Sequence, residues 1–318
     1  MTGMRTLIGD ALTPAARAWI RYAPMSAGKP WLWDNFNWRR HAFTCWTQGG
    51  RMTGNTEDLI QKHLYFFGTW EPNISHWVAT HLKPGDGFID IGANIGHYSL
   101  LASRIVGDQG CVVAIEAAEW IHSLLDKHVA LNQRRNIRTV QVAASAARGT
   151  LKLFPGSAGN CGKTTTIGGT GKPVDVQALP LSDILRDDEI ERARMIKIDV
   201  EGAELEVLRG LAPLLGRMRE DLEIVMEVSP SLMPEPETSR VAIFSIMNAH
   251  GFSASVFDND YGVETYLRRG SHEAPVPLAD AHLGKQADLL FSRQRTSPMP
   301  SRAVSERAAS ADGTLTPA

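Results

Sequence analysis

The stretch GFIDIGANIGHYSL, residues 87–100, contains a short apolar run that reaches Asp90 and then enters a glycine-containing turn. The run is short enough to be a buried strand, and the HYSLLASRIV segment that follows the turn has the apolar spacing of a helix. A strand, a glycine turn and a helix in succession form the unit with which doubly wound α/β proteins hold nucleotides. The charge and the glycine spacing of the turn therefore decide which ligand is expected.

The turn Gly92-Ala93-Asn94-Ile95-Gly96 lacks the G-x-G-x-x-G spacing that lets a backbone approach a pyrophosphate. Asp90 stands just before it, where a carboxylate repels a diphosphate and attracts a cation. S-adenosylmethionine suits this arrangement because it has an adenosine, a ribose diol, a positive sulfonium and an amino group, but no phosphate. The two glycines allow close passage of a ligand, and Asn94 tolerates left-handed backbone at the centre of the turn.

A second acidic residue, Glu116, follows the apolar run CVVAI and lies 26 residues after Asp90. Doubly wound nucleotide-binding folds place at this point the acid that accepts hydrogen bonds from a ribose diol. Capping of the following helices is the alternative explanation for both acids. Their joint occurrence with the glycine turn favours S-adenosylmethionine binding.

Seven apolar runs predict strands, and they lie at residues 87–91, 111–115, 137–142, 195–198, 222–226, 253–257 and 288–291. Amphipathic helical segments separate the first five of them. Short buried strands that alternate with helices predict an α/β fold with a doubly wound, mostly parallel sheet covered on both faces. Ligands of such sheets bind at the carboxyl ends of the strands, where the strand order reverses.

The ends of the chain differ from this alternating region. Residues 1–55 form a Trp-rich extension, in which we expect the tryptophans of WLWDNFNWRR (31–40) to pack an N-terminal helical cap rather than to stack on a ligand. Residues 56–293 form the predicted catalytic domain, which begins with two short helices joined at GTWEPN. Residues 294–318 are rich in Ser, Ala, Pro and Arg without apolar periodicity, and they predict a disordered tail.

Composition excludes several classes of partner. The formal net charge of −2 gives no general reason to expect nucleic acid or an anionic membrane surface. The polar residues near the start interrupt any signal peptide or membrane span. Cys45, Cys111 and Cys161 are scattered, which suggests neither a zinc cluster nor a disulfide framework. We therefore expect a cytoplasmic protein without a membrane span.

Two motifs together, DIGANIG (90–96) and KIDVEGAELEVLRG (197–210), resemble those of class I S-adenosylmethionine-dependent methyltransferases, and within them the FkbM family. The resemblance covers roughly residues 56–292. It implies a seven-stranded sheet with one antiparallel strand, S-adenosylmethionine as methyl donor, and methylation of a hydroxyl group on a small molecule, sugar or glycan. One departure is Ala117, where the family usually has proline. The residues expected to bind the cofactor are Asp90, Gly92, Ala93, Asn94, Gly96, Glu116 and Ala143.

The segment GNCGKTTT, residues 159–166, looks like a phosphate-binding P-loop. The G-x-x-x-x-G-K-[ST] pattern requires glycine at position 157, however, and that residue is Ser157. The FkbM resemblance implies instead a substrate loop formed by Asn160, Gly162 and Lys163. Lys163 would contact an acidic group of the substrate, or it is an ordinary solvated lysine.

Three acids are the candidate catalytic residues: Asp199 and Glu227 at the ends of predicted strands, and Glu201 two residues after Asp199, at the start of a predicted helix. Methyl transfer is an in-line displacement that depends on positioning, and a carboxylate can orient an acceptor hydroxyl and take its proton. Helix capping alone would also explain Glu201. Converging acids can bind a divalent cation, but no spaced ligand set demands one, and we predict no metal. His97 follows the glycine turn, and packing is the favoured explanation for it over a role as base.

Two other functions compete with an O-methyltransferase. The first is a nicotinamide-dependent oxidoreductase, which Asp90 and the glycine spacing disfavour. The second is a non-catalytic module that binds S-adenosylmethionine without turnover.

Overall fold

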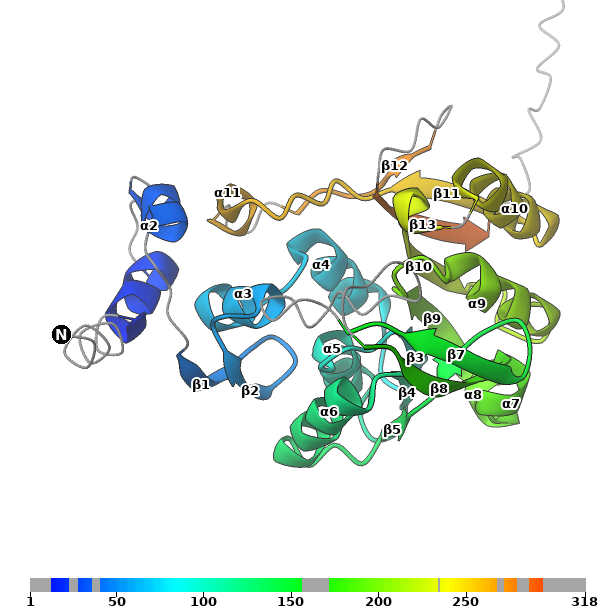
Figure 1. The fold of residues 1–318 in the computed structure, drawn as a ribbon, viewed down its shortest axis with the longest axis horizontal. Helices are drawn as coiled ribbons and strands as arrows, with labels where there is room; N and C mark the ends of the chain where they lie inside the picture. Colours follow the sequence, from blue (N-terminus) through cyan, green and yellow to red (C-terminus); the bar gives the residue numbers. More distant parts are fainter. Residues whose placement is uncertain are drawn as a thin grey trace, which may run out of the picture.

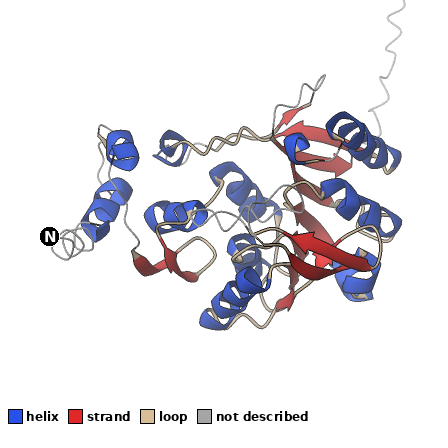
Figure 2. Ribbon diagram, in the orientation of Figure 1, coloured by secondary structure: helices blue, strands red, loops and turns tan. Residues whose placement is uncertain are grey.

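The computed structural model of the protein describes residues 13–22, 28–35, 41–155, 172–233, 235–267, 272–278 and 286–293. One large mixed sheet runs through the molecule and carries helices on both faces (Figures 1 and 2). Its strands lie in the order β12-β11-β13-β10-β9-β3-β4-β5. In chain order they are β3 (Gly87–Ile91), β4 (Cys111–Ile115), β5 (Ile137–Val140), β9 (Ala193–Ile198), β10 (Glu223–Val228), β11 (Phe252–Val256), β12 (Val276–Pro277) and β13 (Ala287–Arg293).

All seven predicted strands belong to this sheet, and the prediction of a doubly wound, mostly parallel α/β fold is confirmed. Five neighbouring strands from β5 to β10 run parallel, and β13 pairs antiparallel with both β10 and β11. The two-residue strand β12 is an eighth member that was not predicted, and it pairs antiparallel with the edge strand β11. The strand order reverses between β3 and β9, which is where such a sheet binds its ligand.

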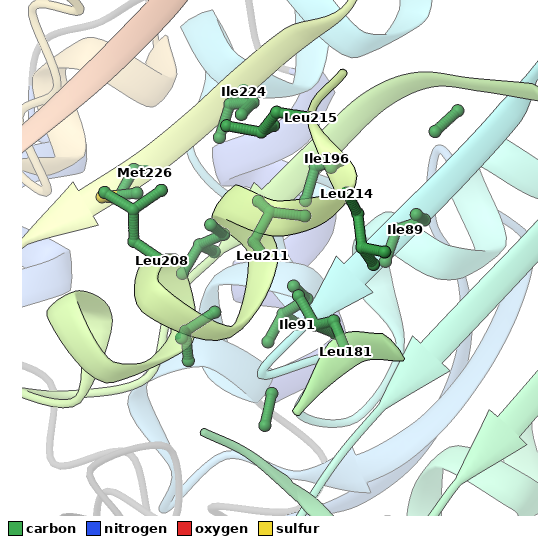
Figure 3. Packing of buried hydrophobic residues seen from close by; sticks show 14 of the residues in the cluster. Ile89, Ile91, Leu181, Ile196, Leu208, Leu211, Leu214, Leu215, Ile224 and Met226 are labelled. Atoms are coloured by element: carbon green, nitrogen blue, oxygen red, sulfur yellow. The ribbon is translucent and has the colours of Figure 1, made fainter. Parts of the chain in front are cut away.

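Each face of the sheet buries alternate residues of the same strands, because successive side chains of a strand point to opposite faces. On one face β3, β9 and β10 pack against α7 (Leu181–Ile184), α8 (Asp187–Arg192), α9 (Glu204–Leu211) and α10 (Pro236–Ala249). Figure 3 shows this packing through Ile89, Ile91, Leu181, Ile196, Leu208, Leu211, Leu214, Leu215, Ile224 and Met226.

The opposite face buries Phe88, Met195 and Val225, all at most 1% exposed. It packs against α4 (Pro72–His81), α5 (His97–Val106) and α6 (Glu119–Leu131). Both faces of the strands are therefore apolar. This double burial explains why the strands appear as continuous hydrophobic runs in the sequence.

The N-terminal part contains helical residues 13–22, α2 (Lys29–Asn35), a hairpin of β1 (Ala42–Trp46) and β2 (Arg51–Asn55), and α3 (Leu59–Phe67). The hairpin was not predicted. It docks on α6 through His128, whose Nε2 lies 3.1 Å from the Thr53 amide nitrogen and whose Nδ1 lies 2.8 Å from the Ile95 carbonyl oxygen. Trp33 packs edge-on against His63 and Phe66, as expected for a cap held by apolar contacts. The predicted domain limits at residues 55 and 293 stay predictions.

A second, three-stranded sheet in the order β6-β8-β7 lies beyond β5 in the chain. Its strands are β6 (Ala143–Ala144), β7 (Gly149–Leu153) and β8 (Val174–Leu179). The remaining elements are η1 (Ala212–Leu214), η2 (Pro230–Leu232) and α11 (Val263–Leu267). Within the described residues, no helix combines the length and the apolar character needed to cross a bilayer. The predicted tail, 294–318, lies outside the described residues.

Candidate active site

The glycine turn after β3 brings two strand ends into close contact. Gly92 and Gly96 have positive φ angles of 81° and 89°, and Asn94 between them has φ 50°. A Cβ atom on Gly92 would lie 1.8 Å from the carbonyl oxygen of Asp199, so that only glycine fits there. The Gly92 amide donates a hydrogen bond to the Ile115 carbonyl at 2.9 Å, which ties the turn to β4 as well.

Glu116, directly after β4, fastens the same turn. Its Oε2 accepts a hydrogen bond from the Asn94 amide, and its Oε1 accepts one from the Ala118 amide, both at 2.9 Å. Burial raises the pKa of Glu116 to about 7, although the two amide hydrogen bonds favour the charged form. Glu116 therefore holds the turn in place and presents a carboxyl group to the space above the strand ends.

Asp199 stands at the end of the neighbouring strand β9. Its amide donates a hydrogen bond to the Ile91 carbonyl at 2.9 Å, and its Oδ2 lies 2.7 Å from Nζ of Lys197. Lys197 is 3% exposed, and its ammonium group also lies 4.8 Å from the ring centroid of Tyr98. Burial disfavours the lysine charge, but the carboxylates of Asp199 and Glu71 outweigh burial and raise the pKa of Lys197. The buried cation holds the Asp199 side chain in one orientation.

A cavity of about 290 Å³ lies over these strand ends. Gly92, Asn94, Glu116 and Asp199 form part of its wall. On the side of β4 and β6 the wall is apolar and consists of Ile115, Ala117, Ile121, Val142, Ala143, Ala144, Leu151 and Leu153. On the side of β9 and β10 it consists of Trp70, Glu71, Asp199, Val200, Glu201, Ala203, Glu227 and Tyr261. The cavity thus has an apolar part and an acidic part that meet at the glycine turn.

The family model described as the methyltransferase FkbM domain matches residues 90–254, slightly more than half of the chain. The matched segment includes the glycine turn, Glu116, Asp199 and Glu227. The chain belongs to the FkbM methyltransferase family. The resemblance of its motifs to this family is thereby confirmed.

Relatives of this FkbM methyltransferase include Methyltransferase sdnD of Sordaria araneosa, which is 34% identical over 202 residues and covers 53% of this chain and 74% of the relative. Methyltransferase 1 of Beauveria bassiana is 30% identical over 149 residues, or 40% of this chain, and the chain spans only 59% of that relative. The crystal structure of Methyltransferase FkbM from Methylobacillus flagellatus KT has a TM-score of 0.43 at 14% identity, over 74% of this chain and 55% of that chain.

The predicted cofactor residues of this FkbM methyltransferase divide into two groups. Gly92, Asn94, Glu116 and Ala143 line the cavity, whereas Asp90, Ala93 and Gly96 do not. The carboxylate of Asp90 is 1% exposed and accepts a hydrogen bond from the Ser99 hydroxyl at 2.5 Å. Burial raises the pKa of Asp90 to about 6. Asp90 thus anchors α5 behind the turn.

All three predicted catalytic acids line the cavity. The helix after Glu201 begins at Glu204 with Ala203 as its N-cap, so Glu201 is not the cap of that helix. Glu201 has a φ of 48° and lies in the turn before the helix. Glu227 is 6% exposed, and its Oε1 accepts a hydrogen bond from the Ser229 hydroxyl at 3.2 Å.

Two further acids adjoin Glu227 and were not predicted. Asp288 on β13 is its cross-strand partner, and Glu71 precedes α4. One carboxylate oxygen from each of the three residues lies within 4.8 Å of the others. Burial raises the pKa of all three carboxyl groups. Oxygen ligands at this spacing are able to bind a single cation, a divalent metal ion included.

Hydroxyl groups fix the position of Glu71. Its carboxylate accepts hydrogen bonds from the Tyr98 hydroxyl at 2.6 Å and from the Tyr261 hydroxyl at 3.0 Å. Glu71 has left-handed backbone with a φ of 45°, which its residue type does not indicate in the sequence. Only the fold, however, brings Glu71 next to Tyr261, which is 190 residues later in the chain.

Other predicted residues lie away from the described cavity wall. His97 is 4% exposed, and its Nε2 lies 3.0 Å from the Ser75 hydroxyl, in agreement with the favoured packing role. Burial lowers the pKa of His97 to about 3. Asn160, Gly162 and Lys163 lie outside the described residues.

Proposed function

We propose that this protein is an S-adenosylmethionine-dependent methyltransferase that methylates a hydroxyl oxygen of a small molecule, sugar or glycan. The observation that carries the proposal is the placement of Glu116 and Asp199 on two sides of the Gly92 turn, facing one cavity. The first acid suits a ribose diol and the second suits an acceptor. The predicted cytoplasmic location belongs to this proposal and is supported by the free thiols of Cys45 and Cys111.

The cavity wall fits the chemistry of this cofactor. The aliphatic side chains next to Glu116 form an apolar slot for an adenine ring, and the Glu116 carboxyl group is able to accept hydrogen bonds from ribose hydroxyls. Gly92 allows the turn to lie against the Asp199 backbone, so that both residues form part of one cavity wall. When bound, the cofactor supplies an activated methyl group. The protein residues bind it, exclude water and orient the acceptor.

On the acceptor side, Asp199 is the residue that we assign to orient the hydroxyl group and accept its proton. Its side chain is 26% exposed, and Lys197 engages only one of its two oxygens. The other oxygen has no hydrogen-bond partner among the described residues. Glu201 and Glu227 stand in the same wall and are the alternative bases. Asn160, Gly162 and Lys163 keep their predicted role as a substrate loop.

The oxidoreductase alternative is disfavoured by charge. No Lys, Arg or His occurs among the described residues of the cavity wall, and the acids there would repel a dinucleotide diphosphate. The other alternative, a module that binds S-adenosylmethionine without catalysis, differs from the proposed enzyme only in that no methyl group is transferred.

Calorimetric titration of the purified protein with S-adenosylmethionine, S-adenosylhomocysteine and NAD separates the first two functions. We expect both adenosyl compounds to bind and NAD not to bind. Binding of NAD alone would overturn the proposal. Transfer of a labelled methyl group to hydroxylated acceptors, detected by mass spectrometry, then distinguishes an enzyme from a binding module.

Replacement of Glu116 tests the assignment of the cofactor half. Glu116→Gln keeps the shape but loses charge-assisted hydrogen bonds, so the affinity for S-adenosylmethionine should fall by roughly 1 to 3 kcal/mol. The control is Glu206→Gln on the exposed side of α9, where the side chain is 46% exposed. Equal affinities of both folded variants would contradict the ribose assignment.

A further inference from the structure

The cavity wall has a one-sided charge. Among its described residues, Glu71, Glu116, Asp199, Glu201 and Glu227 carry carboxyl groups, and no basic side chain offsets them within the wall. The nearest described cation, Lys197, lies behind Asp199 and is already paired with it. Burial raises the pKa of Glu71, Glu116 and Glu227, so these carboxyl groups give up their protons when a cationic group binds beside them, whereas an anionic group finds no basic partner among the described residues of the wall.

An aromatic pair stands beside the acids. Trp70 and Tyr261 both line the cavity, and their rings stack with centroids 5.2 Å apart and planes inclined by 28°. Tyr261 also donates its hydroxyl hydrogen bond to Glu71. Aromatic rings next to carboxylates are the chemical combination that binds ammonium groups, because ring faces and carboxylates both attract positive charge.

One carboxylate oxygen of Glu227 is able to accept a hydrogen bond from a ligand. The residue is 94% buried, and Ser229 engages only one of its carboxylate oxygens. The second oxygen has no hydrogen-bond partner among the described residues, although Glu227 lines the cavity. This oxygen is open to the cavity rather than sealed inside the protein, so a ligand in the cavity is able to donate a charge-assisted hydrogen bond to it.

We propose that the methyl acceptor is an amino alcohol whose ammonium group binds between Glu227, Glu71 and the Trp70–Tyr261 pair, beside the hydroxyl that is methylated. This proposal rests on the proposed function and names the substrate class of the same site. A single nitrogen with hydrogen bonds of about 2.8 Å is able to reach three oxygens spaced as those of Glu71, Glu227 and Asp288 are.

The residues of the ammonium site come from segments far apart in the chain. Trp70 and Glu71 precede the segment that matches the FkbM family, and Tyr261 follows it. The common segment therefore provides the turn, Glu116 and Asp199, whereas flanking elements provide most of the ammonium site.

The test uses three probes of one shape, benzylamine, benzyl alcohol and benzoate, titrated calorimetrically at pH 7 into the full chain saturated with S-adenosylhomocysteine. Benzylamine is an ammonium ion at this pH. We expect it to bind at least about tenfold more tightly than benzyl alcohol, and benzoate to bind more weakly than either. Equal binding of benzylamine and benzyl alcohol would overturn the proposal.

Two variants and one control localise the binding. Glu227→Gln should reduce benzylamine affinity to that of benzyl alcohol, and Tyr261→Leu should reduce it about threefold. Glu237→Gln, on α10 with a side chain 80% exposed, should leave it unchanged. Each variant is first checked for unchanged S-adenosylhomocysteine affinity. If Glu227→Gln binds benzylamine like the wild type, the ammonium site is wrong.

A manganese titration separates the two kinds of cation. If Mn²⁺ binds to the wild type but not to Glu227→Gln, and benzylamine binds to neither, the three carboxyl groups form a metal site and the ammonium site is wrong. Failure of the wild type to bind S-adenosylhomocysteine would instead contradict the proposed function, so the two failures are distinguishable.

Discussion

Replacement of Gly92 by alanine measures how closely the ends of β3 and β9 must approach each other. The new Cβ would lie 1.8 Å from the Asp199 carbonyl oxygen, and real Cβ contacts are essentially never shorter than 3.0 Å. The Asp199 backbone must therefore retreat by more than 1 Å. Left-handed backbone at alanine costs about 1 kcal/mol, and forced overpacking adds about 1 to 3 kcal/mol. We expect a loss of roughly 2 to 4 kcal/mol in the free energy of unfolding.

The matched control for this variant is Gly85→Ala. Gly85 also has a positive φ, 90°, but a Cβ there meets no atom within 4 Å. The free energy of unfolding of Gly85→Ala should fall by only about 1 kcal/mol, because the strain of the left-handed backbone is its sole cost. The difference between the two variants isolates the contact between Gly92 and Asp199.

Urea unfolding followed by tryptophan fluorescence gives both stabilities, and calorimetry gives the affinity for S-adenosylmethionine. In Gly92→Ala the affinity should fall about tenfold or more, because the turn and the Asn94 amide that Glu116 holds shift together. In Gly85→Ala it should not change. Equal losses of stability in the two variants, or full cofactor affinity in Gly92→Ala, would refute this account of the turn.

Three further predictions concern ionisable side chains. Asp199→Asn should lower turnover by about 10² or more with cofactor affinity nearly preserved, and equal losses in both would move Asp199 into the cofactor site. Lys197→Met leaves the Asp199 carboxylate without its buried partner and should cost about 3 to 5 kcal/mol in urea unfolding; a loss below 1 kcal/mol would contradict the role of this pair. Burial raises the pKa of Glu204 to about 7, so its contribution to stability is present below pH 4.5 and is lost as the pH rises through 7. Glu204→Gln should therefore flatten the fall of the unfolding free energy between pH 5 and 8 by up to about 3 kcal/mol, and an unchanged slope would exclude this titration.

Local patterns in the sequence were sufficient to predict the sheet and the turn. The central strands β3, β4, β9 and β10 are buried on both faces, and this double burial leaves short hydrophobic runs that are recognisable without the fold. Gly92, Asn94 and Gly96 were recognisable as a tight turn because their left-handed backbone conformation restricts the residue type. Glu116 was predicted because its place after the second strand follows from the same alternation of strands and helices.

The direction of the Asp90 side chain was decided by packing around β3. Ile89 and Ile91 face the helices α7 to α10, so the alternation of a strand turns Asp90 to the opposite face, where Ser99 of α5 binds it. The alternation of side chains along β3 could be predicted from the sequence. The face on which Asp90 lies could not be predicted, because it depends on helices that pack from elsewhere in the chain.

The acidic end of the cavity was decided entirely by tertiary structure. Asp288 reaches Glu227 because β13 inserts antiparallel between β10 and β11, and Glu71 reaches both because Tyr98 and Tyr261 hold its carboxylate. Local propensity and periodicity act over a few residues, whereas Glu71 and Asp288 are 217 positions apart. Sequence alone therefore determined the strands and the turn that form one side of the cavity. The meeting of the three buried carboxyl groups of Glu71, Glu227 and Asp288 arose from strand order and burial, which act only once the chain is folded.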